Sequence, residues 1–508
     1  MKLPTQSNLS SSWKQGIVTI LVFGGILLQI NEYIANRSLW LDELNVANHI
    51  LSHGVFEILL AQNFGYPLGF VIIERIVTYI LGGSEFALRL FPLVCGILSV
   101  VFFPKIIGRF ADANTTVIGT ALFALSFKLI YYATEVKPYA LDILITLVLL
   151  NMFVDFYQND RIEKPLFLFK SALLGCAAIL FSTRAILVLG GAGAILLMKF
   201  WKEKKTVKAK SLTFLVACWA GTFLLYYALV LRRFLDSYNL KEWDVVHTAP
   251  PPIFSLDAVA WLFSDAFYAL LFPLTYEMAL AQFLFIAGLI FLFSKNAGIF
   301  GVMTAPILLT AVLGFFGYPL YDRLLLFLMP LLIIIIAFGV NVISTHPAMK
   351  YKKILAVFCL FLLMRPSLLA TTLQFTEKYA HEEIKPVLEV ARKNIRPDDV
   401  MYVYYGASPA FKYYADRYQL NNGEVIEGVF SREDRAKYLD DIKLISQHAR
   451  TWVLFSHIYK DEDLFFLDNI KEYGGEVIVF FQMVPRPRST PFAGRSFVVL
   501  YAFKSAKD

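Results

Sequence analysis

Long apolar runs separated by short polar turns fill the first 373 residues of the chain. An apolar run of about 18 or more residues with few charges is typical of a helix that crosses a membrane. The pattern therefore predicts a polytopic α-helical membrane protein with about eleven spanning helices. We expect these helices at Gly16–Ile34, Arg89–Ile107, Thr115–Tyr132, Tyr139–Tyr157, Leu166–Ser182, Ala185–Phe200, Leu212–Leu231, Glu277–Phe293, Gly298–Phe316, Leu324–Ile343 and Ile354–Thr372.

A twelfth apolar stretch, Leu256–Phe272, differs from the others. It is short, contains Asp257 and Asp265, and follows the three prolines Pro250–Pro252. Apolar segments of this kind usually lie along the membrane surface. We expect an interfacial or re-entrant helix here rather than a further span.

The region from residue 374 to 508 has a different texture and predicts a small α/β domain. Charges are frequent, and short apolar runs alternate with amphipathic stretches, as strands alternate with helices in α/β proteins. We therefore divide the chain into a membrane domain, residues 1–373, and this C-terminal domain. Strands are expected at Val400–Tyr405, Trp452–Ser456, Val477–Phe481 and Phe497–Phe503, and helices at Glu382–Lys393, Pro409–Arg417, Arg432–Gln447 and Asp461–Tyr473.

Composition agrees with a membrane protein. Of the 508 residues 57% are hydrophobic and 17% are charged, whereas about a quarter of the residues of a soluble protein are charged. The net charge of +7 does not indicate nucleic-acid binding, because lysines and arginines that flank spans set membrane orientation.

The distribution of those basic residues predicts the orientation. Basic residues concentrate in alternate loops, which by the positive-inside rule lie in the cytoplasm. The N-terminus is then cytoplasmic, and an odd number of spans places the C-terminal domain outside. The inside loops contain Lys105, Arg109, Arg161, Lys164, Lys170, Lys199, Lys202, Lys204, Lys205, Lys208, Lys210, Lys295, Lys350, Lys352 and Lys353.

The first outer loop, residues 35–88, is unusually long and contains two amphipathic or apolar pieces, Leu44–Leu51 and Pro67–Leu81, which we expect along the membrane interface. Long loops in compact proteins are often functional. Asp42 and Glu43 follow the first span as adjacent acids. They could serve catalysis, or they could stabilise the first turn of a helix by interacting with its dipole.

Further charged residues recur at the short outer turns. Glu135 and Lys137 lie between the third and fourth spans, Arg184 in the next outer turn, and Arg323 before the tenth span. Each could be structural, since long basic side chains near a membrane boundary can reach the headgroups. Together with Asp42 and Glu43 they predict a polar cavity at the outer membrane face.

Five motifs in this order resemble the GT-C membrane glycosyltransferases. They are LWLDE, FGYPLGF, SEFALRLFP, TEVKPYA and YDRLLLFLMP, and the resemblance covers roughly Trp40 to Pro330. The resemblance is greatest to the family-39 branch, which contains protein O-mannosyltransferases and aminoarabinose transferases. The stretch PDDVMYVYYGASPAFKYYADRY resembles outer-face domains of bacterial members. The chain departs from the family pattern at Tyr66-Pro67-Leu68, where two prolines are common, and at Lys137, where arginine is common.

The resemblance implies transfer of a hexose or pentose from a polyprenyl-phosphate carrier to an acceptor on a protein, lipid or glycan. It implies a location in a bacterial inner or plasma membrane. Asp42 would be the general base and Glu43 its alternative. Lys137, Arg323 and Arg184 would neutralise the departing phosphate, Glu135 would orient Lys137 or bind the sugar, and Tyr66 would belong to the donor site. No cofactor is required by the sequence, although Asp42 and Glu43 could hold a divalent metal ion.

Two other classes of protein remain open from the sequence. A secondary transporter would also have many spans and charged residues in the membrane, but the chain has no repeated halves. A protein of the same fold without catalytic activity could bind the carrier lipid and act in assembly. The presence of Asp42, Glu43 and Lys137 favours the enzyme.

Overall fold

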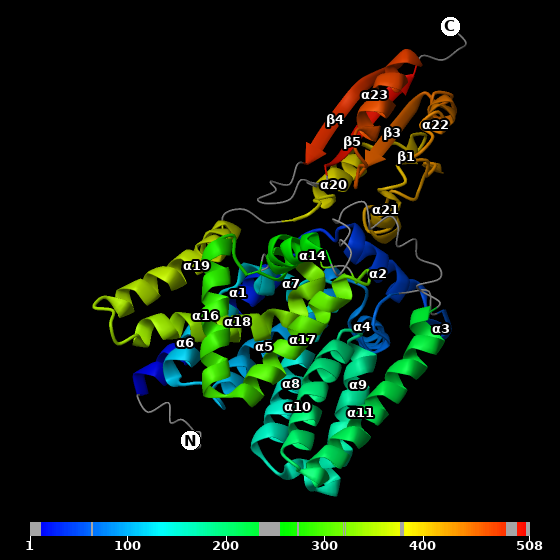
Figure 1. Cartoon of the computed structure of the whole chain (residues 1–508). Helices are drawn as coiled ribbons and strands as arrows, with labels where there is room; N and C mark the ends of the chain where they lie inside the picture. Colours follow the sequence, from blue (N-terminus) through cyan, green and yellow to red (C-terminus); the bar gives the residue numbers. More distant parts are fainter. Residues whose placement is uncertain are drawn as a thin grey trace. The chain divides into compact units, whose positions relative to one another are not determined.

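The computed structural model describes residues 12–61, 65–232, 255–271, 274–318, 320, 322–375, 380–483 and 495–503 (Figure 1). Several expected features lie partly outside these ranges, namely Phe64 of the FGYPLGF motif, Pro250–Pro252, Phe272 and Tyr321. The described chain forms two compact units. The helical unit comprises residues 12–34, Gly54–Gly82 and Phe86–Leu373, and the α/β unit comprises Ala35–His53, Gly83–Glu85 and the described residues from Gln374 onward.

Most of the expected spans are helices in the helical unit. Nine helices among the described residues are long and apolar enough to cross a membrane. These helices are α1 (Ser12–Ile34), α5 (Glu85–Ile107), α8 (Tyr139–Gln158), α10 (Ala185–Lys202), α11 (Thr206–Tyr226) with its π-helical extension η2 (Tyr227–Leu231), α16 (Met278–Lys295), α17 (Ala297–Gly314), α18 (Met329–Thr345), preceded by the 3-10 helix η4 (Asp322–Leu328), and α19 (Lys352–Gln374).

One expected span is divided. The run Thr115–Tyr132 forms two helices, α6 (Ala113–Ala124) and α7 (Phe127–Tyr132), so the prediction of a single helix there was wrong. Leu125 ends α6, with its backbone N–H bonded to Ala121 and Phe123, and Ser126 has an extended backbone. The sequence gives no sign of this break, because the residues on both sides of it are equally apolar and hydrophobicity does not report backbone conformation.

Three further features of the helical unit concern shorter segments. The expected span Leu166–Ser182 corresponds to α9 (Pro165–Phe181), which follows the 3-10 helix η1 (Arg161–Glu163). The twelfth apolar stretch is helical, as α14 (Leu256–Trp261), the π-helix η3 (Leu262–Ala266) and α15 (Phe267–Leu271). The first loop contributes α3 (Val55–Ala61) and α4 (Leu68–Leu81).

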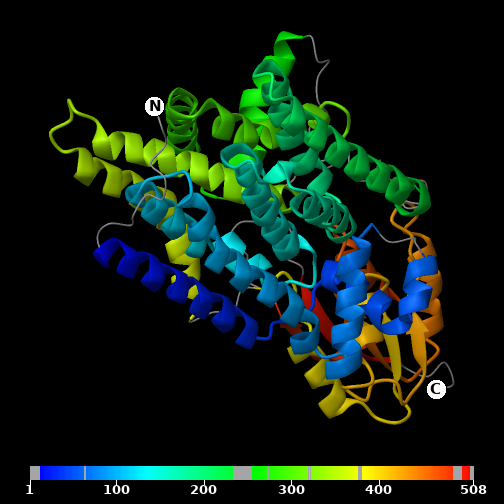
Figure 2. The same cartoon turned by 90° about the horizontal axis from the view of Figure 1, so that it is seen from below.

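Close backbone approach explains how two of the spanning helices pack. A Cβ atom added to Gly288 of α16 would lie 1.9 Å from the carbonyl oxygen of Ile335, and one added to Gly339 of α18 would lie 1.9 Å from that of Leu284. Small residues at such crossings let helices in membranes approach closely. Helix α18 is accordingly buried on nearly every side and forms the centre of the unit. The helices α9, α10 and α11 lie side by side in both ribbon views (Figures 1 and 2).

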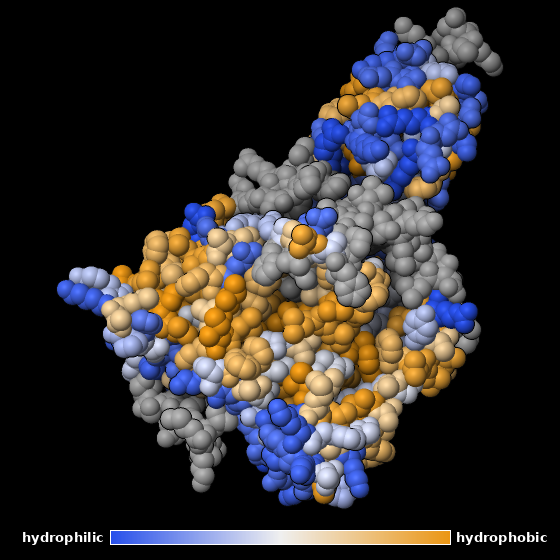
Figure 3. Space-filling view, in the orientation of Figure 1, coloured by the Kyte–Doolittle hydropathy of each residue, from blue (hydrophilic) through white to orange (hydrophobic). Residues whose placement is uncertain are grey.

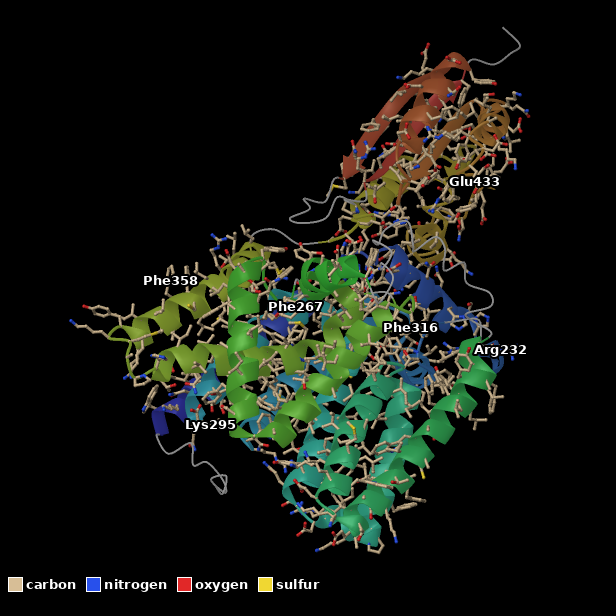
Figure 4. All side chains as sticks on the ribbon, viewed as in Figure 1. Arg232, Phe267, Lys295, Phe316, Phe358 and Glu433 are labelled. Carbon is tan, nitrogen blue, oxygen red and sulfur yellow. The ribbon has the colours of Figure 1, made fainter. Side chains whose placement is uncertain are left out.

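The outer surface of the helical unit is apolar. The face in Figure 3 shows a broad hydrophobic area over α16 and α19, with polar residues at the end of the α10–α11 hairpin. Phe316 and Phe358, labelled in Figure 4, have 74% and 53% of their surface exposed. Apolar surface of this extent on a protein requires an apolar partner, and a bilayer supplies one. The chain is an integral membrane protein.

The α/β unit is built on a five-stranded sheet in the order β2-β1-β3-β5-β4. Strands β1 (Val400–Val403), β2 (Val425–Glu427) and β3 (Arg450–Phe455) are parallel, and β5 (Ser496–Phe503) pairs antiparallel with β3 and with β4 (Gly475–Met483). The helices are α2 (Leu41–Ser52), α20 (Lys385–Asn394), α21 (Ser408–Tyr414), α22 (Lys437–Ile445) and α23 (Glu462–Glu472). Four strands and four helices therefore occur where the alternating pattern predicted them; only β2, three residues long, was missed.

Helix α2 belongs to the α/β unit although it comes from the first loop, and it packs against α21. This arrangement restricts how the chain can cross the membrane. Parts of one folded unit cannot lie on opposite sides of a bilayer. The chain between Glu85 and Gln374 must therefore cross the membrane an even number of times. Among the described residues, eight long apolar helices follow α1. The two expected spans that shorter helices form, α6 with α7 and α9, would bring the number of crossings to ten, which is even.

Candidate active site

Helix α2 places the two predicted catalytic acids in its first turn. It begins at Leu41, after the extended backbone of Trp40, whose side chain provides no capping hydrogen bond. Asp42 and Glu43 follow at once, where the positive end of the helix dipole favours negative charge. Glu43 is completely buried, whereas Asp42 retains some exposed surface. Of the two, Asp42 is the better placed to meet a substrate.

The C-terminal region of the chain fixes the segment that enters α2. The backbone N–H of Leu39 donates to the hydroxyl of Tyr414, at 3.0 Å in a buried position. The Ser38 hydroxyl donates to Glu383 and accepts from the backbone N–H of Ile384, at 3.2 Å. All three partners of this segment lie more than 340 residues away in sequence. The position of Asp42 and Glu43 within the α/β unit therefore depends on contacts with the C-terminal region.

A second group of contacts holds the other end of the first loop in the same unit. Arg417 donates to the Glu85 carboxylate at 2.8 Å, and Lys385 lies 3.4 Å from the other oxygen of that carboxylate. Tyr413 donates to the carbonyl oxygen of Gly83 at 2.7 Å. Both ends of the loop are thus bonded to the C-terminal region.

In the helical unit the structure brings Tyr66 and Lys137 together. The Lys137 ammonium donates to the Tyr66 hydroxyl at 2.6 Å and lies 4.5 Å from the centre of its ring. Only 4% of Lys137 is exposed. Removing a cation from water is costly unless anionic or polar groups surround it. Lys137 is thus a buried cation before the start of α8, at a position where the sequence predicts a ligand of the donor phosphate.

Glu135 and Arg323 lie in buried or half-buried positions of the helical unit. Glu135 is fully buried, and its carbonyl oxygen accepts from the Lys137 backbone N–H at 2.6 Å, so the two residues share one tight turn. Arg323 is half-buried on η4, which packs against α8. Their proposed roles remain predictions.

Arg184 has a strong partner that the sequence analysis did not identify. Its guanidinium lies 2.6 Å from the carboxylate of Asp142 in the first turn of α8, and Asp142 is 1% exposed. The ion pair compensates the charge of Arg184, which favours a structural role over phosphate binding. An acid within an apolar run was the available signal, because such residues in membrane helices are generally paired.

We expect Arg184→Gln to destabilise the helical unit by about 3–5 kcal/mol, because it leaves the Asp142 carboxylate buried without its counter-ion. Thermal unfolding of the detergent-solubilised protein measures the loss. The double variant Arg184→Gln, Asp142→Asn removes both charges and should regain most of the stability. A single variant that unfolds normally but binds donor weakly would instead identify Arg184 as a phosphate ligand.

A divalent metal ion would need more ligands than the acid pair provides. Among the described residues, no three His, Cys, Asp or Glu side chains gather closely enough to hold an ion. His49 and His53 of α2 have ring centres 4.5 Å apart, and burial, together with His53, lowers the pKa of His49 to about 4. Within the described part of the chain, the acid pair therefore does not belong to a three-ligand cluster for a metal ion.

Comparison with known proteins adds to this picture. Residues 66–227 match the family model of dolichyl-phosphate-mannose-protein mannosyltransferases. No curated protein matches the chain in sequence.

Solved structures give matches over nearly the whole chain. ArnT from Cupriavidus metallidurans, bound to undecaprenyl phosphate, is 12% identical with a TM-score of 0.53, over 96% of this chain and 98% of ArnT. The archaeal oligosaccharyltransferase AglB from Archaeoglobus fulgidus, in complex with an inhibitory peptide and a dolichol-phosphate, is 11% identical with a TM-score of 0.52. That match covers 99% of this chain and 75% of AglB.

These findings define the class of the protein as a polytopic membrane protein with a small C-terminal sheet domain, as predicted. At 11–12% identity the solved structures establish the fold. The fold is that of these solved structures, the GT-C fold that the sequence motifs resemble. The predicted fold class and resemblance are therefore confirmed.

Proposed function

We propose that the protein transfers a sugar from a polyprenyl-phosphate carrier to an acceptor hydroxyl at the outer face of the membrane. The observation that most supports this proposal is the buried cation Lys137, held by Tyr66 within the stretch that matches the mannosyltransferase model. In the same fold, ArnT binds undecaprenyl phosphate and AglB binds a dolichol-phosphate. An apolar exterior suits a donor whose tail is a lipid.

The reaction is a displacement at the anomeric carbon. The acceptor oxygen forms a bond to that carbon while the bond from carbon to the phosphate oxygen breaks and its electron pair leaves with the phosphate. The acceptor proton must go to a base, and Asp42 takes it. Its partial exposure supports Asp42 over the fully buried Glu43.

The leaving group gains negative charge as the bond breaks. A phosphodiester with one charge becomes a phosphate monoester with two, and a preorganised cation stabilises that change in the transition state. Lys137 supplies this cation, and Tyr66 orients it through the 2.6 Å hydrogen bond. Arg323 is a second candidate for the same role. Arg184 is less suited because Asp142 already compensates its charge.

Charge and topology together support the proposed location at the outer face. Basic residues concentrate in the loops that we assign to the cytoplasm, and α1 carries the chain from there to α2. The contacts between α2 and the tail support placing both on the same side. Donor, base and tail would therefore all act outside the cytoplasm, in a bacterial inner or plasma membrane.

Purified protein in lipid nanodiscs, given radiolabelled polyprenyl-phosphate sugars and an acceptor-containing envelope fraction, tests the proposal. We expect label to move from the carrier lipid to the acceptor fraction, with no transfer from nucleotide sugars. Absence of transfer, combined with uptake of solutes into proteoliposomes, would contradict the proposal and identify a transporter. Carrier-lipid binding without transfer or uptake would identify a non-catalytic binding protein.

A further inference from the structure

Three loops of the α/β unit meet at one edge of its sheet. They follow β1, β2 and β3, the three parallel strands, and so lie at the carboxyl ends of these strands. The strand order places β2 on one side of β1 and β3 on the other. The order in which successive strands are added to the sheet therefore reverses at β1. In open α/β sheets, ligands bind outside the carboxyl ends of the strands at such a switch point.

The loops at this edge form an aromatic cluster around one arginine. The guanidinium of Arg432, after β2, lies 4.4 Å from the ring centre of Tyr459, 5.2 Å from that of Phe430 and 5.7 Å from that of Tyr405. The rings of Tyr405 and Phe430 make an edge-to-face contact at 4.9 Å. Figure 4 labels Glu433, the exposed residue next to Arg432.

A buried carboxylate orients this arginine through a tyrosine. Glu462, 1% exposed, accepts from the hydroxyl of Tyr405 at 2.8 Å and from that of Tyr404. Because its proton goes to Glu462, the Tyr405 oxygen accepts from Nε of Arg432, at 3.1 Å. Within the described chain, the two Nη groups of Arg432 donate no hydrogen bond. Because Tyr405 fixes the orientation of the guanidinium through Nε, these Nη groups point in a fixed direction and can donate to a ligand.

The backbone of the β3 loop supports a role in binding. His457 and Lys460 both have positive φ, 49° and 51°, on either side of Tyr459. Such a conformation is costly for residues other than glycine and is common where loops clamp a ligand. Gly406, after β1, leaves no space for a side chain, since a Cβ there would lie 2.7 Å from the carbonyl oxygens of Ser456 and His457. The loops after β1 and β3 are thus packed backbone to backbone.

The same edge is linked to the segment that enters α2. The His457 ring bonds to Glu382 at 2.6 Å. The neighbouring His381 contacts the ring of Trp40, with centres 4.5 Å apart, and Trp40 directly precedes the helix that contains Asp42. The aromatic cluster and the proposed base therefore belong to one connected structure within the α/β unit.

We infer that this edge, formed by Tyr405, Phe430, Arg432 and Tyr459, is a carbohydrate-binding site that receives a glycan acceptor. The inference rests on the proposed function and specifies its acceptor as a glycan. Sugar rings stack their C–H faces on exposed aromatic rings, and their hydroxyls accept from fixed donors such as Arg432. A carboxylate accompanies each arginine at this edge, since Asp461 pairs with Arg435 and Glu462 is linked to Arg432 through the hydroxyl of Tyr405. A neutral ligand therefore fits better than an anion.

Saturation-transfer NMR on the full-length protein in nanodiscs tests the site without any need for catalysis. The probes are the methyl glycosides of glucose, galactose and mannose, together with their disaccharides and trisaccharides. We expect transfer to the ring protons of at least one saccharide series, with millimolar affinity. Phe430→Ala and Arg432→Gln should each weaken the signal at least about fivefold. Phe430 is 63% exposed, so its replacement leaves the core intact.

The controls separate this site from the proposed catalysis. Phe480→Ala, at a residue of β4 that is 52% exposed, should bind as the wild type does. Asp42→Asn should also bind normally; if it binds and still transfers sugar, the proposed base fails while the glycan site stands. The inference is overturned if no saccharide gives a signal, if the signal persists in both site variants, or if only inorganic phosphate or a serine-containing peptide binds.

Discussion

Replacing Asp42 with asparagine is expected to reduce kcat for sugar transfer at least about 100-fold, the range found when a general base is removed. Asparagine keeps the shape of the side chain but cannot accept the acceptor proton at neutral pH. The KM for the donor should change little, because Asp42 acts on the acceptor. Steady-state transfer assays with a radiolabelled donor measure both constants.

The matched control is Asp440→Asn, which makes the same change at an exposed acid in the first turn of α22, in the same unit. It should leave activity unchanged. If Asp42 served only to stabilise the start of α2, its variant would lose stability, about 0.5–1 kcal/mol, and little activity. Full activity in Asp42→Asn would remove it from the mechanism and direct attention to Glu43.

Replacing Lys137 with glutamine should lower kcat by about 100-fold or more, as is typical when one preorganised group is removed from a developing oxyanion. Donor affinity should fall as well, since the ground-state phosphate already carries a charge. Lys137→Arg retains the charge and should recover much of the activity. The same assay, run over a range of donor concentrations, separates the two effects.

Two further variants make the Lys137 result specific. Lys105, in the last turn of α5, also lies near an aromatic ring, since its ammonium is 5.8 Å from the ring centre of Phe102. The variant Lys105→Gln should therefore leave kcat and KM unchanged. Tyr66→Phe removes only the hydroxyl that holds the ammonium, so we expect a smaller loss than in Lys137→Gln. Normal kinetics in Lys137→Gln would transfer the role to Arg323.

Local pattern was sufficient to predict most elements of this fold. A span needs about twenty apolar residues and the strands of the sheet need short apolar runs, and both requirements are visible in neighbouring residues. The division of Thr115–Tyr132 was not visible, because the break at Leu125 and Ser126 depends on backbone geometry. Strand β2 was too short to produce a run.

The contacts within the candidate site were even less predictable from the sequence than the elements of the fold. The charged outer turns predicted Lys137 and Arg184 as candidate site residues, but they did not show which residue each one contacts. Asp142 pairs with Arg184 across 42 residues, and Tyr414 holds the backbone of Leu39 across 375. Such contacts arise only when distant parts of the chain fold together, so a single sequence contains little sign of them.

The sharing of one folded unit between Ala35–His53 and the tail also has a consequence for how the protein is made. The ribosome synthesises the acid pair early and Tyr414, Arg417 and the sheet last. Residues 35–53 therefore remain without their folding partners until more than 300 further residues have been synthesised. A nascent or prematurely terminated chain would complete its membrane helices and still lack the folded α/β unit, so the proposed site would form only at the end of synthesis.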